Sequence, residues 1–145
     1  MRKATMLVIG AVMLLSSALL AATAAATTPA NETILLRRDL SDFAEVDWSA
    51  SGAFVDSGDW TSDGAAFGNG HITLFTTETG SAGSFRLLFQ GLEKLPNHPF
   101  SGNWQIIDGT GAYATLQGQG KWTVDVPVPP NTVETFTLTG EVHFN

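Results

Sequence analysis

The clearest pattern in the chain is an alternation of apolar and polar residues close to residue 145. From Glu134 onward every second residue is apolar or small, namely Phe136, Leu138, Gly140, Val142 and Phe144. The residues between them are polar, namely Thr135, Thr137, Thr139, Glu141 and His143. A period of two is typical of a β-strand with one buried and one solvated face. We therefore predict a strand over residues 134–144.

A second alternating segment begins at Ala112. Its inward row would hold Ala112, Ala114, Leu116, Gly118, Gly120, Trp122, Val124 and Val126. The side chains of this row grow from small to large along the segment, as in small barrels whose interior tapers. The Asp108-Gly109 pair before it predicts a hairpin turn.

Shorter segments of the same kind predict further strands. They lie at Phe54–Trp60, His71–Glu78, Phe85–Gly91 and from Gly102, with a first strand over Thr33–Phe43. The proline-rich segments Leu95–Pro99 and Pro127–Asn131 are predicted loops, because proline cannot donate to a strand ladder. Seven or eight strands favour one all-β domain, an antiparallel eight-stranded β-barrel that leaves no exposed edge. A two-sheet sandwich is the alternative.

The first 26 residues predict a cleaved signal peptide. Arg2 and Lys3 precede an uncharged segment from Met6 to Leu20, and small residues follow up to Ala26. The apolar run is shorter than the ~20 residues that span a bilayer. We divide the chain into the signal peptide (1–26), an N-terminal segment with the first strand (27–50) and the β-barrel domain (51–145). The protein is expected to be secreted or periplasmic.

Charge and cysteine content exclude several classes of function. Without Arg2 and Lys3 the chain keeps five basic residues against 14 acidic ones, a net charge of about −9. Such a surface repels phosphate, so nucleic acid is a poor partner. The absence of cysteine excludes disulfides, thiol nucleophiles and cysteine metal sites. Polar residues on the solvated face of the strands also speak against a membrane-embedded barrel.

Three pieces of the sequence resemble a known family. They are Gly83–Leu87 (GSFRL), Gly102–Ile106 (GNWQI) and Gly109–Gly120 (GTGAYATLQGQG). They resemble secreted bacterial proteins of the allene oxide cyclase-like barrel superfamily, which also holds the plant allene oxide cyclases and dirigent proteins. The resemblance spans about Phe54 to Asn145. It implies an eight-stranded barrel with an apolar cavity for a lipid-like or phenolic guest, and a homo-oligomer as in plant relatives.

No residue of this chain matches the polar residues that guide ring closure in the plant cyclase, so catalytic residues stay unknown. His71, His98 and His143 have no partners at zinc-ligand spacing. Asp59–Gly64 only partly resembles a calcium loop, because Gly70 stands where a bidentate Glu is expected. We assign no metal and no cofactor, and we explain Asp63-Gly64 as a simple turn.

The aromatic residues and the glycines of the inward rows are the candidate ligand site. Trp104 and Trp122 flank the glycine-rich strand, and Gly118 and Gly120 could leave space beside Trp122. Leu116 and Phe136 would share this interior, with Glu134 at the barrel mouth. An ordinary filled core explains the same residues.

Three functions follow from these observations. The leading one is binding of a small apolar or aromatic ligand in the barrel without catalysis. The second is a cofactor-free cyclase or isomerase acting on a lipid-like substrate, which requires a buried ionisable residue beside a cavity. The third is a structural or carbohydrate-adhesive protein, for which exposed Trp48 and Trp60 would supply a stacking platform.

Overall fold

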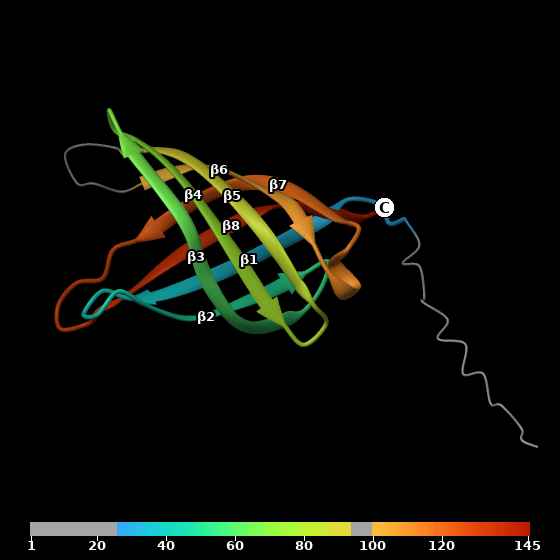
Figure 1. Cartoon of the computed structure of the whole chain (residues 1–145), viewed down its shortest axis with the longest axis horizontal. Helices are drawn as coiled ribbons and strands as arrows, with labels where there is room; N and C mark the ends of the chain where they lie inside the picture. The colour runs from blue at the N-terminus through green and yellow to red at the C-terminus, as the bar shows by residue number, and fades with distance from the viewer. Residues whose placement is uncertain (1–25, 94–99) are drawn as a thin grey trace, which may run out of the picture.

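The computed structural model describes residues 26–93 and 100–145, and its eight strands form a closed antiparallel barrel (Figure 1). The predicted fold class is confirmed. The strands are β1 (Ala30–Asp39), β2 (Ala44–Gly52), β3 (Asp56–Gly68), β4 (His71–Gly80), β5 (Ser84–Glu93), β6 (Phe100–Gly109), β7 (Leu116–Asp125) and β8 (Val133–Phe144). A short 3-10 helix, η1 (Gly111–Tyr113), connects β6 to β7. The predicted signal peptide and the predicted loop at Leu95–Pro99 lie outside the described residues, except for Ala26.

Closure of the barrel comes from the pairing of β1 with β8. Ala30 pairs with Val142, and the ladder continues without a break to Asp39 and Val133. Just before β1, the Thr27 amide donates to the Phe144 carbonyl. This pairing excludes the two-sheet sandwich, because every strand has a neighbour on both sides.

The predicted alternation in β8 and β7 is confirmed within the strands and fails before β7. Phe136, Leu138 and Val142 of β8 are buried, as are Leu116, Trp122 and Val124 of β7. Ala112 and Ala114, placed in the inward row, are exposed, and Tyr113 is buried instead. The reason is that residues 111–113 form a 3-10 helix, whose side chains do not alternate between two faces. Val126, also placed in that row, is exposed beyond the end of β7.

The barrel begins before residue 51. β1 and β2 both lie within residues 27–52 and are two of the eight strands that close the barrel. The β-barrel domain therefore includes these residues and does not start at residue 51. β2 escaped the sequence analysis because only Trp48 and Ala50 on its inner face are buried. The start of the strand, from Ala44 to Val46, is exposed on both faces.

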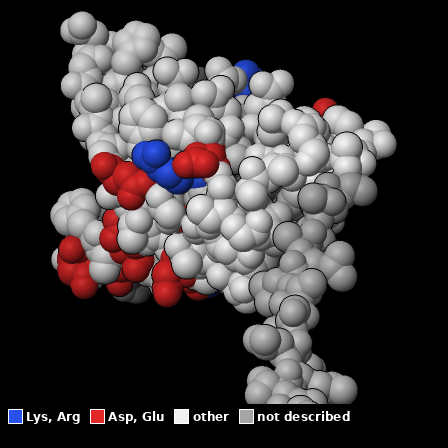
Figure 2. Space-filling model, turned by 45° about the vertical axis from the view of Figure 1, so that its right-hand side comes forward, with Lys and Arg blue, Asp and Glu red and all other residues white. Residues whose placement is uncertain are grey.

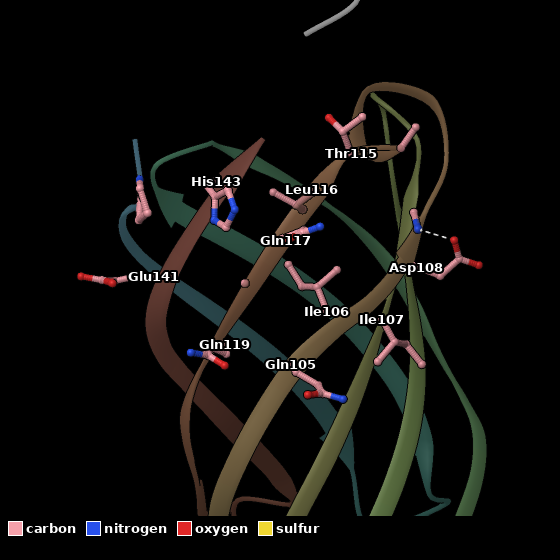
Figure 3. Close-up of a pocket in the computed structure, with 14 residues that line it drawn as sticks. Gln105, Ile106, Ile107, Asp108, Thr115, Leu116, Gln117, Gln119, Glu141 and His143 are labelled. Carbon is pink, nitrogen blue, oxygen red and sulfur yellow. Dashed lines mark hydrogen bonds between the residues drawn. The ribbon is translucent and has the colours of Figure 1, made fainter. Parts of the chain in front are cut away.

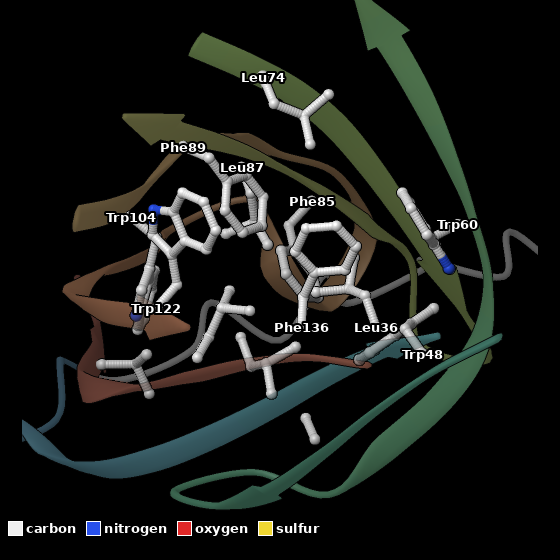
Figure 4. Close-up of a cluster of buried hydrophobic side chains, with 14 of the residues drawn as sticks. Leu36, Trp48, Trp60, Leu74, Phe85, Leu87, Phe89, Trp104, Trp122 and Phe136 are labelled. Carbon is white, nitrogen blue, oxygen red and sulfur yellow. The ribbon is translucent and has the colours of Figure 1, made fainter. Parts of the chain in front are cut away.

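Tryptophan side chains fill the core in a repeated manner (Figure 4). Each of the four indole N–H groups donates to a backbone carbonyl on the second strand away: Trp48 to Thr79, Trp60 to Arg37, Trp104 to Thr139 and Trp122 to Gln90. In three cases the strand between carries a glycine in register with the tryptophan. We call these sets the Trp-Gly-Gly rows: Trp48-Gly58-Gly80, Trp104-Gly120-Gly140 and Trp122-Gly102-Gly91.

The middle glycine of each row makes the hydrogen bond possible. A Cβ on Gly58, Gly120 or Gly102 would lie within 2.0 Å of the very carbonyl oxygen that accepts the indole N–H. The third glycine of each row lies under the indole, because its Cβ would be 2.6–2.9 Å from the tryptophan Cζ2. Glycine in a strand normally marks a close approach of other atoms, and here those atoms are a carbonyl and a ring.

In two places, a strand separates from its neighbour part of the way along the barrel. β2 and β3 pair only from Trp48 to Ala50, and the buried Trp60 packs where β3 leaves β2. β6 and β7 pair only from Ser101 to Gln105. Beyond Gln105, β6 stays paired with β5, and β7 stays paired with β8. The separation of β6 from β7 leaves the opening that positions the candidate site.

Candidate functional site

A groove lies where β6 and β7 separate, and we call it the seam groove (Figure 3). It has a volume of about 570 Å³. Ile106, Ile107 and Leu116 contribute apolar surface to it. Gln105, Gln117, Gln119, Glu141 and His143 contribute polar groups from β6, β7 and β8. The Gly109 amide on its β6 side donates to the Asp108 carboxylate at 2.8 Å rather than to β7.

A second groove of about 540 Å³ adjoins the first on the outer face, and we call it the sheet groove. Its lining includes Gln90, Asn103, Lys121 and the backbone of Gly120 and Gly140. Gln105, Gln119 and Glu141 line both grooves. These three residues are in register on β6, β7 and β8, so they form one ridge between the grooves.

The glycines of the predicted site do not open space in the interior. A Cβ on Gly118 would lie 2.5 Å from Val142 Cγ1, and one on Gly120 would lie 2.0 Å from the Thr139 oxygen. The Trp122 indole, beside which free space is predicted, lies over Gly91 and also contacts Phe89 edge to face and Phe136 in a tilted arrangement. The remaining predicted residues Trp104, Leu116 and Phe136 are buried members of the core. Ligand binding by these residues stays a prediction, and Leu116, Gly118, Trp104 and Gly120 also border the two outer grooves.

The stacking platform proposed for the adhesive alternative does not exist. Trp48 is fully buried and Trp60 is 3% exposed. Both rings are core members because their positions fall on the inner face of β2 and β3, which the sequence pattern could not settle.

Glu134 lies at one end of the barrel, as predicted, and is paired there. Its carboxylate accepts a hydrogen bond from Arg38 Nε at 2.7 Å. The Arg38 guanidinium also lies 5.5 Å from the centre of the Phe136 ring. The carboxylate is thus paired with a cation and lines neither the seam groove nor the sheet groove, and ligand binding by Glu134 stays a prediction.

Glu78 is an interior acid that the sequence analysis missed. Its side chain is fully buried between Trp60 on β3 and Phe85 on β5. Oε1 accepts a hydrogen bond from Thr76 at 2.6 Å, and Oε2 has no partner among the described residues. Burial raises the pKa of Glu78 to about 8. The signal was present, because Ile72, Leu74, Thr76 and Glu78 alternate on the inward face of β4.

Glu78 meets only half of what the enzyme alternative requires. It is a buried ionisable residue, but it lines neither groove. The reaction would need a guest beside this carboxyl, so catalysis stays untested.

Tyr113 of η1 is buried at the opposite end of the barrel. Its hydroxyl donates to Asp56 Oδ2 at 2.6 Å, and its ring packs against Phe54 and Phe85. The Tyr113 hydrogen bond, with further donors from Ser57, Ser81 and Ala82, lowers the pKa of Asp56 to about 2. Burial and the Asp56 carboxylate raise the pKa of Tyr113 above its usual range.

Replacing Tyr113 by phenylalanine should destabilise the protein by about 2 kcal/mol at pH 7, because a hydrogen bond to a charged acceptor is lost. The contribution of ionised Asp56 is present above its ordinary pKa of 3.8 and is lost as the pH falls to about 2. The difference between wild type and Tyr113→Phe should therefore shrink at pH 2. Urea unfolding at both pH values measures it, and equal stability at pH 7 would contradict the assignment.

Charged side chains are unevenly distributed on the surface. Figure 2 shows acidic side chains gathered at the lower left of that face, with a basic group among acidic ones above them, and most of the remaining face uncharged. Arg37 pairs with Asp47, and Arg86 Nε lies 3.4 Å from Asp63.

In residues 26–93 and 100–145 no three His, Asp or Glu side chains gather as a metal site. Asp63 accepts hydrogen bonds from Thr61 and Thr77 and lies at a bulge within β3, not in the expected turn.

Comparisons with known protein families, with curated proteins and with solved structures find no match to this chain. Within the described part of the chain there is no helix long and apolar enough to cross a membrane.

Proposed function

We propose that this protein binds a small ligand without catalysis, and that the seam groove is the binding site. The observation that carries the proposal is the separation of β6 from β7 beyond Gln105, which produces a groove of about 570 Å³. Ligand pockets combine apolar surface with a few placed polar groups, and pockets of ~300–1,000 Å³ are usual. In the seam groove the apolar surface comes from Ile106, Ile107 and Leu116. The polar groups come from Gln117, Gln119 and His143.

This proposal moves the site from the barrel interior to its wall. The interior rows predicted to receive an apolar guest are occupied by indoles and phenyl rings. The ligand we propose binds in the seam groove and therefore contacts both apolar carbon and amide groups. A purely apolar ligand in the barrel interior is disfavoured, because side chains already fill that interior. The resemblance to the allene oxide cyclase-like superfamily, secretion or periplasmic location, and homo-oligomer formation remain part of the proposal.

Filling the seam groove should abolish binding. Gln117 is exposed and lines only this groove, so Gln117→Trp places a large ring in it. Thr123→Trp is the matched control, because Thr123 is exposed on the same face of β7 and lines neither groove. We expect amide chemical-shift changes at Gln105, Ile107 and Gln119 when a library of small fragments is titrated, retained in Thr123→Trp and lost in Gln117→Trp.

Two results would contradict the proposed function. One is fragment binding that Gln117→Trp leaves unchanged. The other is a set of shift changes confined to core residues such as Phe89 and Phe136, which would return the ligand to the interior.

A further inference from the structure

We infer that the ligand is a neutral, hydroxyl-rich chain, such as an oligosaccharide, that lies across both outer grooves; this inference rests on the proposed function. The first step is continuity. The seam groove and the sheet groove share Gln105, Gln119 and Glu141, which are paired across β6, β7 and β8. A ligand longer than either groove can therefore pass from one to the other over a single ridge.

The second step is the chemistry of the lining. Five exposed carboxamide side chains gather on three neighbouring strands: Gln90 on β5, Asn103 and Gln105 on β6, Gln117 and Gln119 on β7. Each carboxamide offers two N–H donors and a carbonyl acceptor. Sugar hydroxyls also donate and accept, so carboxamides match them without requiring a charge.

These carboxamides are also available to a ligand. In the described part of the chain, the side chains of Gln105, Gln117 and Gln119 form no hydrogen bond with another protein group, whereas Asn103 accepts from Lys121. Strands lie ~4.8 Å apart and every second residue along a strand shares a face, so the carboxamides form a grid on the barrel wall. A chain of sugars can bond to successive points of this grid.

The third step is the exclusion of other polymers. The net charge of −7 over the full sequence, together with Asp108 and Glu141 in the seam groove, disfavours an anionic chain. An extended peptide would need a free strand edge to pair with. Beyond Gln105 the seam groove offers the unpaired edges of β6 and β7. A peptide paired there could not continue as an added strand over the ridge and the sheet groove, because the strands beneath them are already paired: Gln90 with Asn103, Gln105 with Gln119, and Gln119 with Glu141.

Length dependence is the test. Neutral β-linked gluco-oligosaccharides from the monosaccharide to the hexasaccharide are titrated against the purified protein by calorimetry and by amide shift mapping. We expect affinity to rise at least tenfold, equivalent to about 1.4 kcal/mol, once the chain is long enough to span both grooves. The shift changes of the longer chains should extend from Gln117 to Gln90.

Single substitutions separate the two grooves. Gln90→Ala, which alters the sheet groove alone, should remove the gain with length and leave the monosaccharide affinity unchanged. Gln119→Ala on the shared ridge should weaken the short and long ligands alike, and Thr123→Ala is the control.

The outcomes distinguish this inference from the proposed function. Fragment binding in the seam groove with no binding of any neutral oligosaccharide overturns the inference and leaves the proposed function standing. Preferential binding of an unstructured peptide or of an oligogalacturonide overturns it in the same way. Absence of both fragment and oligosaccharide binding overturns both.

Discussion

Replacing Glu78 by glutamine should stabilise the barrel by several kcal/mol at alkaline pH. In the folded protein burial raises the pKa of Glu78 to about 8 from an ordinary value of 4.5. The wild type therefore folds with this carboxyl protonated below pH 8, while the unfolded chain ionises it above pH 4.5. As the pH rises through this interval the wild type loses stability, on the order of 5 kcal/mol in all. The carboxamide of glutamine does not ionise, so the free energy of unfolding of the variant does not fall with pH for this reason.

The pH profile distinguishes this effect from better packing. Wild type and Glu78→Gln should unfold with similar free energies below pH 4.5 and diverge as the pH rises to about 8. Glu45→Gln is the matched control, since Glu45 is exposed on β2 and its replacement removes the same formal charge. Denaturant unfolding from pH 4 to pH 9 measures the profile. Parallel curves for wild type and Glu78→Gln would show that the carboxyl is not buried as described.

Substituting Gly58 by alanine should cost about 3 kcal/mol of stability. A Cβ at this position would lie 2.0 Å from the Thr79 oxygen, which accepts the Trp48 indole N–H at 3.0 Å. The added methyl must displace that carbonyl, so it strains the β3–β4 ladder and breaks the indole hydrogen bond together. The loss is expected despite the general advantage of alanine over glycine within a strand.

Gly68→Ala on the same strand provides the comparison. No atom lies within 4 Å of a Cβ built at Gly68, and its φ is outside the left-handed region. This variant should match or slightly exceed the wild type in stability, and thermal unfolding with tryptophan fluorescence follows both. A Gly58→Ala protein as stable as Gly68→Ala would mean that the Trp48-Gly58-Gly80 row is not closely packed.

The period of two was sufficient to predict the fold, and it was insufficient for the site. It located β7 and β8 because their inner and outer faces differ sharply in polarity, as in Leu138 against Thr137 and Thr139. It could not say what occupies the space above a glycine. The indole of Trp104 crosses from β6 to reach Gly140 on β8, a contact that depends on strand order and register rather than on local sequence.

The local sequence also does not predict the seam groove. The local sequence from Asp108 to Ala114 predicts a hairpin turn and the start of a strand, which would keep β6 and β7 paired. Instead, Tyr113 turns inward to bond Asp56 on a strand more than fifty residues earlier in the sequence, and the two strands separate beside it. A long-range hydrogen bond thus overrides the local turn signal.

The pairing of β1 with β8 has a consequence for the time course of folding. It joins Ala30 to Val142 and Asp39 to Val133, residues about a hundred positions apart. Such long-range pairing places β-proteins among the slower folders, in the range of ~milliseconds to seconds. Until β8 is available, β1 has only one neighbour and the barrel cannot close. Closure of the barrel is therefore expected to follow the synthesis of β8 rather than to accompany the synthesis of the earlier strands.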